Sequence, residues 1–168
     1  MVARAYSLHT FERARTEISG SELERIAGYT RKAVSAMLER DLHSPRQYWR
    51  TLTEAVQVLY YHPLPTVRHE AAFVLGAVQY HHEVEQVVAV RALRMAVRRD
   101  PSIITQHESL EALGEIFCIA AVGAAADMAK ILRFKHLHHE DVVDTAQEAF
   151  DSLLGYLRKE GYSGVVRE

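Results

Sequence analysis

Two His-Glu pairs stand in the same sequence frame, 38 residues apart. His69-Glu70 and His107-Glu108 are each followed by Leu-Gly, six and seven residues after the histidine. Two histidines and one carboxylate form the ligand set of non-haem Fe(II) sites, which keep open positions for O2. The repeated pairs therefore predict a metal site that uses His69, Glu70, His107 and Glu108.

Two further His-Glu dipeptides do not share this frame. His82-Glu83 falls in a predicted turn between helices, where a solvated pair is the simpler interpretation. His139-Glu140 is out of frame by one residue, because Glu140-Asp141 is taken to align with the two pairs. We therefore leave both dipeptides out of the predicted site.

The elements that must position these residues are all expected to be helices. Apolar residues recur with helical spacing through almost the whole chain, without a convincing alternating pattern, which predicts an all-α fold. Pro65 and Pro101-Ser102 are typical of helix starts, so both pairs should lie early in a helix. Helices are predicted over 7–18, 21–40, 46–61, 65–79, 84–99, 102–120, 124–134 and 140–159.

The spacing of the pairs also predicts the organisation of the chain. A period of 38 residues in an all-helical chain indicates stacked helix pairs, an α-solenoid. We expect repeats over 46–160, an N-terminal helical cap over 1–45 in the same domain, and a loose tail over 161–168. Gly76 and Gly114 end the stripe that carries each histidine, so they should let a neighbouring helix approach closely.

Composition narrows the class of protein. The chain has 168 residues, 48% of them hydrophobic and 25% charged, and a net charge of -2, which is typical of one globular domain and favours neither nucleic acid nor an anionic membrane as partner. The charged N-terminal stretch and the short apolar run over 116–126 predict neither an export signal nor a transmembrane helix. The single cysteine, Cys118, should be a buried thiol, which fits a cytoplasmic location.

Three stretches together carry a family resemblance: HPLPTVRHEAAFVLGAV, QHESLEALGEI and EDVVDTAQEAF. They resemble the HEAT-like repeats of the phycobilisome-lyase type and, more narrowly, deoxyhypusine hydroxylase, a non-haem di-iron enzyme whose iron ligands are His-Glu pairs on successive repeats. The resemblance covers 46–159. That family carries two such halves and four pairs, whereas this chain has one half and two pairs, so the resemblance implies half of a di-iron site, completed by a homodimer.

The resemblance further implies a function. It points to an O2-dependent di-iron hydroxylase, a monooxygenase cycling between Fe2+ and Fe3+, with His69, His107 and Glu108 as iron ligands and Glu70 as a ligand or catalytic group nearer the substrate. A carboxylate-lined cleft would favour an amine or lysine-like substrate. Other interpretations stay open: a non-catalytic HEAT-type interaction module, a mononuclear site, manganese in place of iron, or a bilin lyase or chaperone role.

Overall fold

The computed structural model describes residues 45–78, 80, 82–118 and 120–161, so the predicted helices over 7–18 and 21–40 lie outside the described residues. Every regular element in these ranges is helical, which confirms the predicted all-α fold. None of the described helices has the length and apolar character to cross a bilayer. The elements are α3 (Pro45–Tyr61), α4 (Pro65–Ala77), α5 (Glu83–Arg99), α6 (Ile103–Glu115), α7 (Ala121–Arg133), the short 3-10 helix η1 (Lys135–Leu137) and α8 (Glu140–Lys159).

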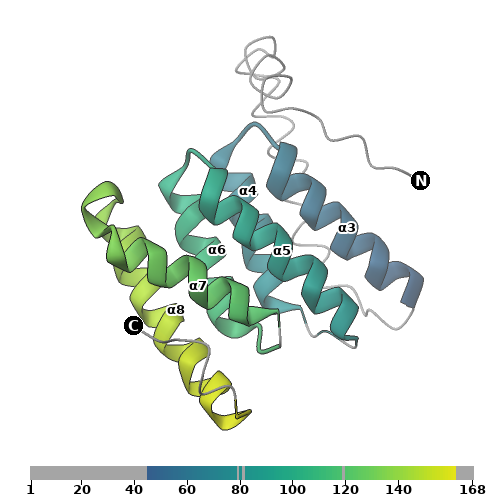
Figure 1. Ribbon diagram of the computed structural model, residues 1–168. Helices are drawn as coiled ribbons and strands as arrows, with labels where there is room; N and C mark the ends of the chain where they lie inside the picture. Colours follow the sequence, from purple (N-terminus) through teal and green to yellow (C-terminus); the bar gives the residue numbers. More distant parts are fainter. Residues whose placement is uncertain (1–44, 79, 81, 119, 162–168) are drawn as a thin grey trace.

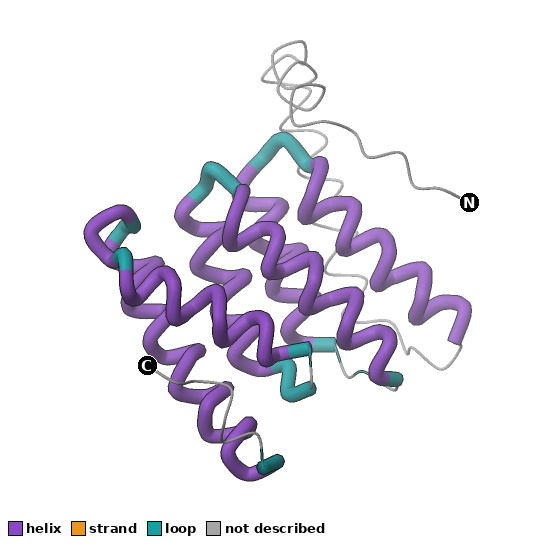
Figure 2. Tube along the Cα trace, in the orientation of Figure 1, coloured by secondary structure: helices purple, strands orange, loops and turns teal. Residues whose placement is uncertain are grey.

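The helices form two layers (Figures 1 and 2). In one layer α6 packs between α4 and α8, and in the other α5 lies between α3 and α7. Short connections join consecutive helices, so α4, α6 and α8 all begin at the same edge of the molecule (Figure 1). Residues at equal distances from the starts of these three helices therefore lie in a row across them.

Helix bounds follow the sequence prediction closely except around the apolar run. The prediction over 102–120 is wrong at its end, because α6 ends at Glu115, and α7 begins at Ala121 instead of residue 124. Ile116, Cys118 and Ala121 are all buried. The sequence is apolar here because these residues lie in the core where the chain turns between α6 and α7. The burial of Cys118 was expected.

The residue before each histidine anchors the loop that leads into its helix. Arg68 is fully buried, donates from Nε and Nη2 to the Asp100 carboxylate at 2.6 and 2.8 Å, and donates from Nη1 to the carbonyl of His62 at 2.8 Å. Gln106, at the matching position of α6, donates from Nε2 to the carbonyl of Asp100 at 2.6 Å. Asp100 also accepts the N–H of Ser102 at 2.9 Å, whereas the Ser102 side chain makes no capping bond.

Close approach of the helices at the two glycines is confirmed. A Cβ built on Gly76 would lie 2.9 Å from the Cβ of Ala112, and one on Gly114 would lie 3.1 Å from the Cα of Ala149. The contact at Gly76 leaves no room for a methyl group, and at Gly114 the neighbouring helix would have to give way by a few tenths of an ångström. Glycine at these two positions therefore allows α4, α6 and α8 to pack this closely.

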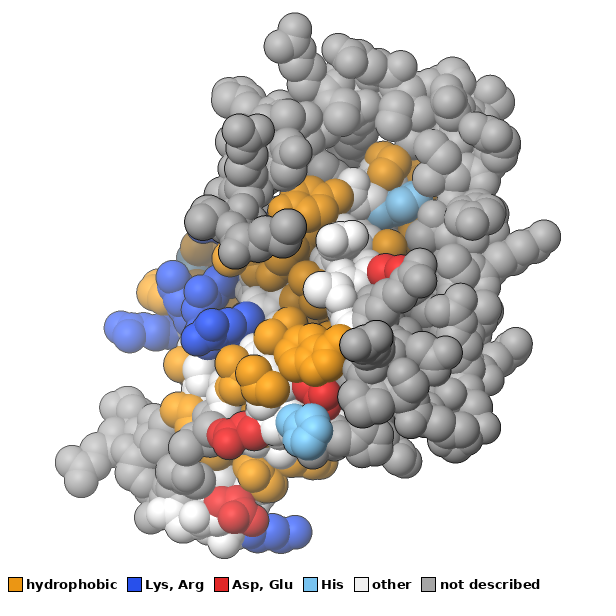
Figure 3. Space-filling model, turned by 90° about the vertical axis from the view of Figure 1, so that its right-hand side faces the viewer, with side chains coloured by type: hydrophobic (Ala, Val, Ile, Leu, Met, Phe, Trp, Pro, Cys, Tyr) orange, Lys and Arg blue, Asp and Glu red, His pale blue; other side chains and the backbone are white. Residues whose placement is uncertain are grey.

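Among the described residues, basic side chains lie mainly on the layer formed by α3, α5 and α7. On α5, Arg91, Arg98 and Arg99 are exposed, and Arg94 donates from Nε to Asp127 of α7 at 2.7 Å. The face on the α3 side shows hydrophobic side chains across its middle, with Lys and Arg side chains gathered mostly at one edge (Figure 3).

Candidate metal centre and acidic groove

The His-Glu pairs occupy the fifth and sixth positions of their helices. His69-Glu70 holds these positions in α4 and His107-Glu108 holds them in α6. In α8 the same positions are Asp144 and Thr145. The alignment of Glu140-Asp141 with the pairs is therefore wrong, because Glu140 begins α8 and the match lies four residues further on.

Each histidine contacts the sixth position of the next helix in the row. His69 Nε2 lies 3.0 Å from Glu108 Oε2, and His107 Nδ1 lies 2.6 Å from the hydroxyl of Thr145. Within each helix the contacts are longer, with His69 Nδ1 3.8 Å from Glu70 Oε1 and His107 Nε2 3.6 Å from Glu111 Oε1, beyond ordinary hydrogen-bond length. The structure thus brings His69 and Glu108 together across two helices.

The two glutamates of the pairs differ in exposure. The Glu108 side chain is 9% exposed, whereas that of Glu70 is 40% exposed. Burial raises the pKa of the Glu108 carboxyl to about 7, with the carboxylates of Glu111, Glu70 and Glu115 adding to the rise and His107 opposing it. Because an imidazole lone pair and a carboxylate repel each other, the 3.0 Å contact with His69 requires a proton or another cation between the two atoms.

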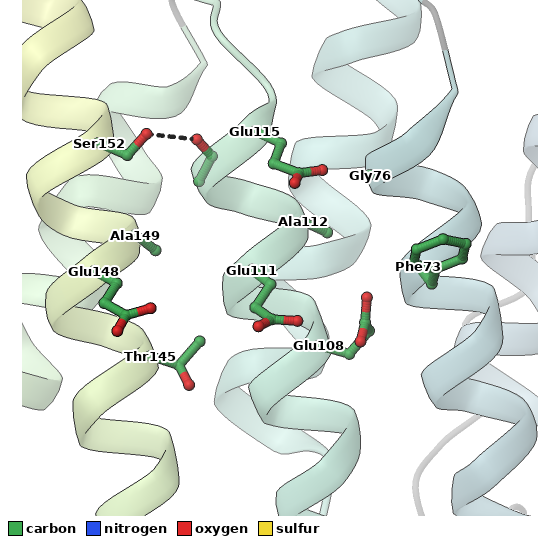
Figure 4. Close-up of a pocket in the computed structure, with 11 residues that line it drawn as sticks. Phe73, Gly76, Glu108, Glu111, Ala112, Glu115, Thr145, Glu148, Ala149 and Ser152 are labelled. Carbon is green, nitrogen blue, oxygen red and sulfur yellow. Dashed lines mark hydrogen bonds between the residues drawn. The ribbon is translucent and has the colours of Figure 1, made fainter.

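A cavity of about 320 Å³ lies beside this contact, and we call it the acidic groove. Four of its side chains are glutamates, contributed by α6 and α8, and Phe73 of α4 stands at its other side (Figure 4). Of the four predicted site residues, Glu108 lines the groove. Its lining is Phe73, Gly76, Glu108, Glu111, Ala112, Gly114, Glu115, Thr145, Glu148, Ala149 and Ser152.

Most of the groove was missed at the level of sequence, although a signal for it exists. Glu108, Glu111 and Glu115 follow one stripe of α6, at intervals of three and four residues. The groove residues Thr145, Glu148 and Ser152 of α8 stand at the same intervals, and Glu148 lies 37 residues after Glu111. Helical spacing along the face that carries Glu108 would have identified Glu111 and Glu115, whereas Glu148 lies one residue off the 38-residue period of the pairs.

The donor atoms fit part of a metal site. Ligand atoms on adjacent corners of an octahedron with bonds of about 2.1 Å lie about 3.0 Å apart, which matches the separation of His69 Nε2 and Glu108 Oε2. Across the described ranges, however, no three His, Cys, Asp or Glu side chains are arranged so that they could hold a metal ion. In the described residues, His69 and Glu108 are thus two side chains at the separation of adjacent ligands, and no third ligand joins them.

Comparison with known proteins adds no relative: no protein-family model, no curated protein and no solved structure matches the chain.

Proposed function

We propose that the protein is an O2-dependent non-haem di-iron hydroxylase that works as a homodimer. The observation that carries the proposal is the pairing of His69 with Glu108, from two different repeats, at the distance of adjacent metal ligands. The same His-Glu frame carries the resemblance to deoxyhypusine hydroxylase.

Within one chain, His69 and Glu108 hold a single proton where a metal cation would bind. Below the raised pKa of Glu108, about 7, the pair holds a proton that binding of the cation would release, so the affinity should rise with pH up to that value. His107 lies in the same row of residues. Its Nε2 is 3.6 Å from Oε1 of Glu111, which lines the acidic groove. Bound iron would activate O2, while the chain's own residues hold the metal and exclude water.

A second copy would complete the site. The described part of one chain has no three-ligand arrangement, whereas the facial triad of non-haem Fe(II) oxygenases uses two histidines and a carboxylate for each iron. A two-fold axis places the same patch of both copies face to face. Each copy would then contribute His69, Glu70, His107 and Glu108 to one shared centre.

The groove suggests a cationic substrate. Glu111, Glu115 and Glu148 line it together with Phe73, whose side chain is 45% exposed. Clustered carboxylates attract a cation, and an aromatic face favours an ammonium group further. An amine or lysine-like side chain fits this chemistry, and Glu70, being more exposed than Glu108, would lie nearer to it.

Metal content, native mass and an optical spectrum test the proposal on one anaerobically purified sample loaded with Fe(II). We expect about one iron per chain in a dimer and a visible band after exposure to O2. His69→Ala and His107→Ala should lose the iron and keep their helical circular dichroism. His138→Ala, which changes an exposed histidine of the α7–α8 connection, is the matched control and should keep it. Wild-type protein that takes up no Fe(II) would refute the proposal.

A second candidate is a non-catalytic interaction module that binds a cationic segment of a partner. The four groove glutamates favour it, because they need no metal to attract a cation. It predicts that His69→Ala leaves partner binding intact, whereas Glu148→Gln weakens it. Both candidates place a lysine-like group in the groove, so Fe(II) uptake separates them: salt-sensitive binding of a lysine-rich peptide by wild-type protein that takes up no Fe(II) would favour this candidate over the hydroxylase.

A further inference from the structure

Thr145 makes the second contact in the row of histidines. Its hydroxyl lies 2.6 Å from His107 Nδ1 and 2.7 Å from the backbone carbonyl of Asp141, one turn earlier in α8. The Thr145 residue is 6% exposed, so water does not compete for these bonds. Both partners of the hydroxyl therefore come from the protein.

Counting protons decides the direction of each bond. A hydroxyl has one hydrogen, and a carbonyl oxygen can only accept, so the hydrogen of Thr145 goes to the carbonyl of Asp141. Towards His107 the hydroxyl can then only accept, and Nδ1 must carry a hydrogen. In a neutral imidazole the other nitrogen, Nε2, then holds the lone pair.

The Nε2 atom of His107 is open to a ligand. It lies 3.6 Å from Glu111 Oε1, too far for a hydrogen bond, and the His107 side chain is 36% exposed. If the neutral ring carried its hydrogen on Nε2 instead, Nδ1 and the carbonyl of Asp141 would both be acceptors. The Thr145 hydroxyl could then donate its single hydrogen to only one of them. The contacts around the ring therefore favour one tautomer.

We propose that Thr145 is a positioning residue that holds His107 as the Nδ1–H tautomer, so that Nε2 is the atom that binds a metal. The assignment of the tautomer stands on the hydrogen bonds alone, whereas its use in metal binding rests on the proposed function. Ligand histidines in proteins commonly donate their second ring N–H to an acceptor, which fixes the ring. Here the acceptor is a hydroxyl that passes the chain of hydrogen bonds on to Asp141.

The row gives His69 the opposite orientation. His69 turns Nε2 towards the next helix, where Glu108 stands at the position that Thr145 holds in α8. A carboxylate at this position offers a metal ligand, whereas a hydroxyl offers only a hydrogen bond to the ring. Thr145 thus orients a histidine ring, a role that the repeated His-Glu pairs did not predict.

Nitrogen NMR of the histidine rings tests the assignment on 15N-labelled, metal-free full-length protein, above the ordinary imidazole pKa of about 6.5. Two-bond proton–nitrogen correlations identify the tautomer, and His107→Ala assigns the signals. We expect Nδ1–H for His107 in wild type and in Thr145→Ser, and a shift towards Nε2–H in Thr145→Val. Thr105→Val removes another buried hydroxyl, which donates to the carbonyl of Pro65, and should leave the tautomer unchanged. An Nε2–H tautomer in wild type would overturn the inference.

Fe(II) binding, measured by anaerobic equilibrium dialysis, separates the two proposals. Loss of a ring-orienting partner typically weakens metal binding 10- to 100-fold, so we expect about this loss in Thr145→Val and recovery in Thr145→Ser. If wild type shows the Nδ1–H tautomer but binds no Fe(II), the proposed function fails and the tautomer assignment stands. If Thr145→Val changes the tautomer and binds Fe(II) as tightly as wild type, the positioning role is refuted.

Discussion

His69 Nε2 lies 3.0 Å from Glu108 Oε2, and this contact joins two helices whose His-Glu pairs are 38 residues apart. The next contact in the row, from His107, reaches the neutral hydroxyl of Thr145 instead of a carboxylate. The row therefore contains one carboxyl group, which can ionise, and one hydroxyl, which cannot in this range, so the two histidines are not equivalent although their sequence frames are identical.

The raised pKa of Glu108 predicts a pH dependence of stability in the metal-free protein. Between pH 4.5, the ordinary value, and about 7, native Glu108 keeps a proton that the unfolded chain has lost. The native state then binds more protons, so the free energy of unfolding should fall as pH rises through this window, by up to about 3 kcal/mol. Denaturant unfolding at several pH values measures it.

Glu108→Gln isolates this effect. The amide oxygen can still accept a hydrogen bond from His69, but it does not titrate in this range. The fall in the free energy of unfolding between pH 4.5 and 7 should be smaller in this variant than in wild type. Glu160→Gln, at an exposed residue at the end of α8 that does not contribute to the raised pKa of Glu108, should keep the wild-type slope. Parallel slopes for wild type and Glu108→Gln would contradict the prediction.

Gly76→Ala should destabilise the fold by separating α4 from α6. The added methyl group would meet the Cβ of Ala112 at 2.9 Å and its Cα at 3.0 Å, and backbone cannot move aside as a side chain can. Overpacking of this kind costs about 1–3 kcal/mol. Thermal and denaturant unfolding give the difference directly.

Gly155→Ala is the matched control for that variant. Gly155 is an exposed helical glycine of α8 with nothing within 4 Å of an added Cβ. Alanine there should stabilise the protein by about 0.5–1 kcal/mol, since it favours the helix. If both variants changed stability in the same direction, steric contact at Gly76 would not be the cause.

Arg68→Ala should be the most destabilising of these substitutions. It removes a buried guanidinium that binds both carboxylate oxygens of Asp100 and the carbonyl of His62, and it leaves Asp100 without its charge partner. Loss of one partner of a buried ion pair costs about 3–5 kcal/mol. The measurement is again the free energy of unfolding.

Asp127→Asn provides the contrast. Asp127 pairs with Arg94 and Arg98, whose side chains are 25% and 50% exposed and keep contact with water when the charge is lost. The cost should be at most about 1 kcal/mol. Equal losses in Asp127→Asn and Arg68→Ala would show that burial does not decide the strength of these ion pairs.

Local sequence was enough to predict most of the helices. Apolar spacing and proline predicted α4 to begin at Pro65, and α8 agrees at both ends, because these signals act within a few residues. The end of α6 was not predictable in this way. The apolar run after Glu115 contains no proline, and its one glycine, Gly123, lies inside α7. Ile116 and Cys118 are buried although they lie outside any helix. The turn is therefore accompanied by burial in the folded chain and not by a local stop signal.

The features of the candidate site also fall into those that the sequence predicts and those that tertiary packing decides. The sequence by itself determined that two His-Glu pairs start two neighbouring helices and that a glycine follows each pair two turns later, because both depend on a fixed repeat length. Only the tertiary structure decided which atoms meet. The packing of α6 between α4 and α8 brings His69 to Glu108 and His107 to Thr145, and it buries Glu108 while Glu70 stays 40% exposed. Packing between helices sets side-chain direction and burial, and no repeat in the chain encodes these on its own.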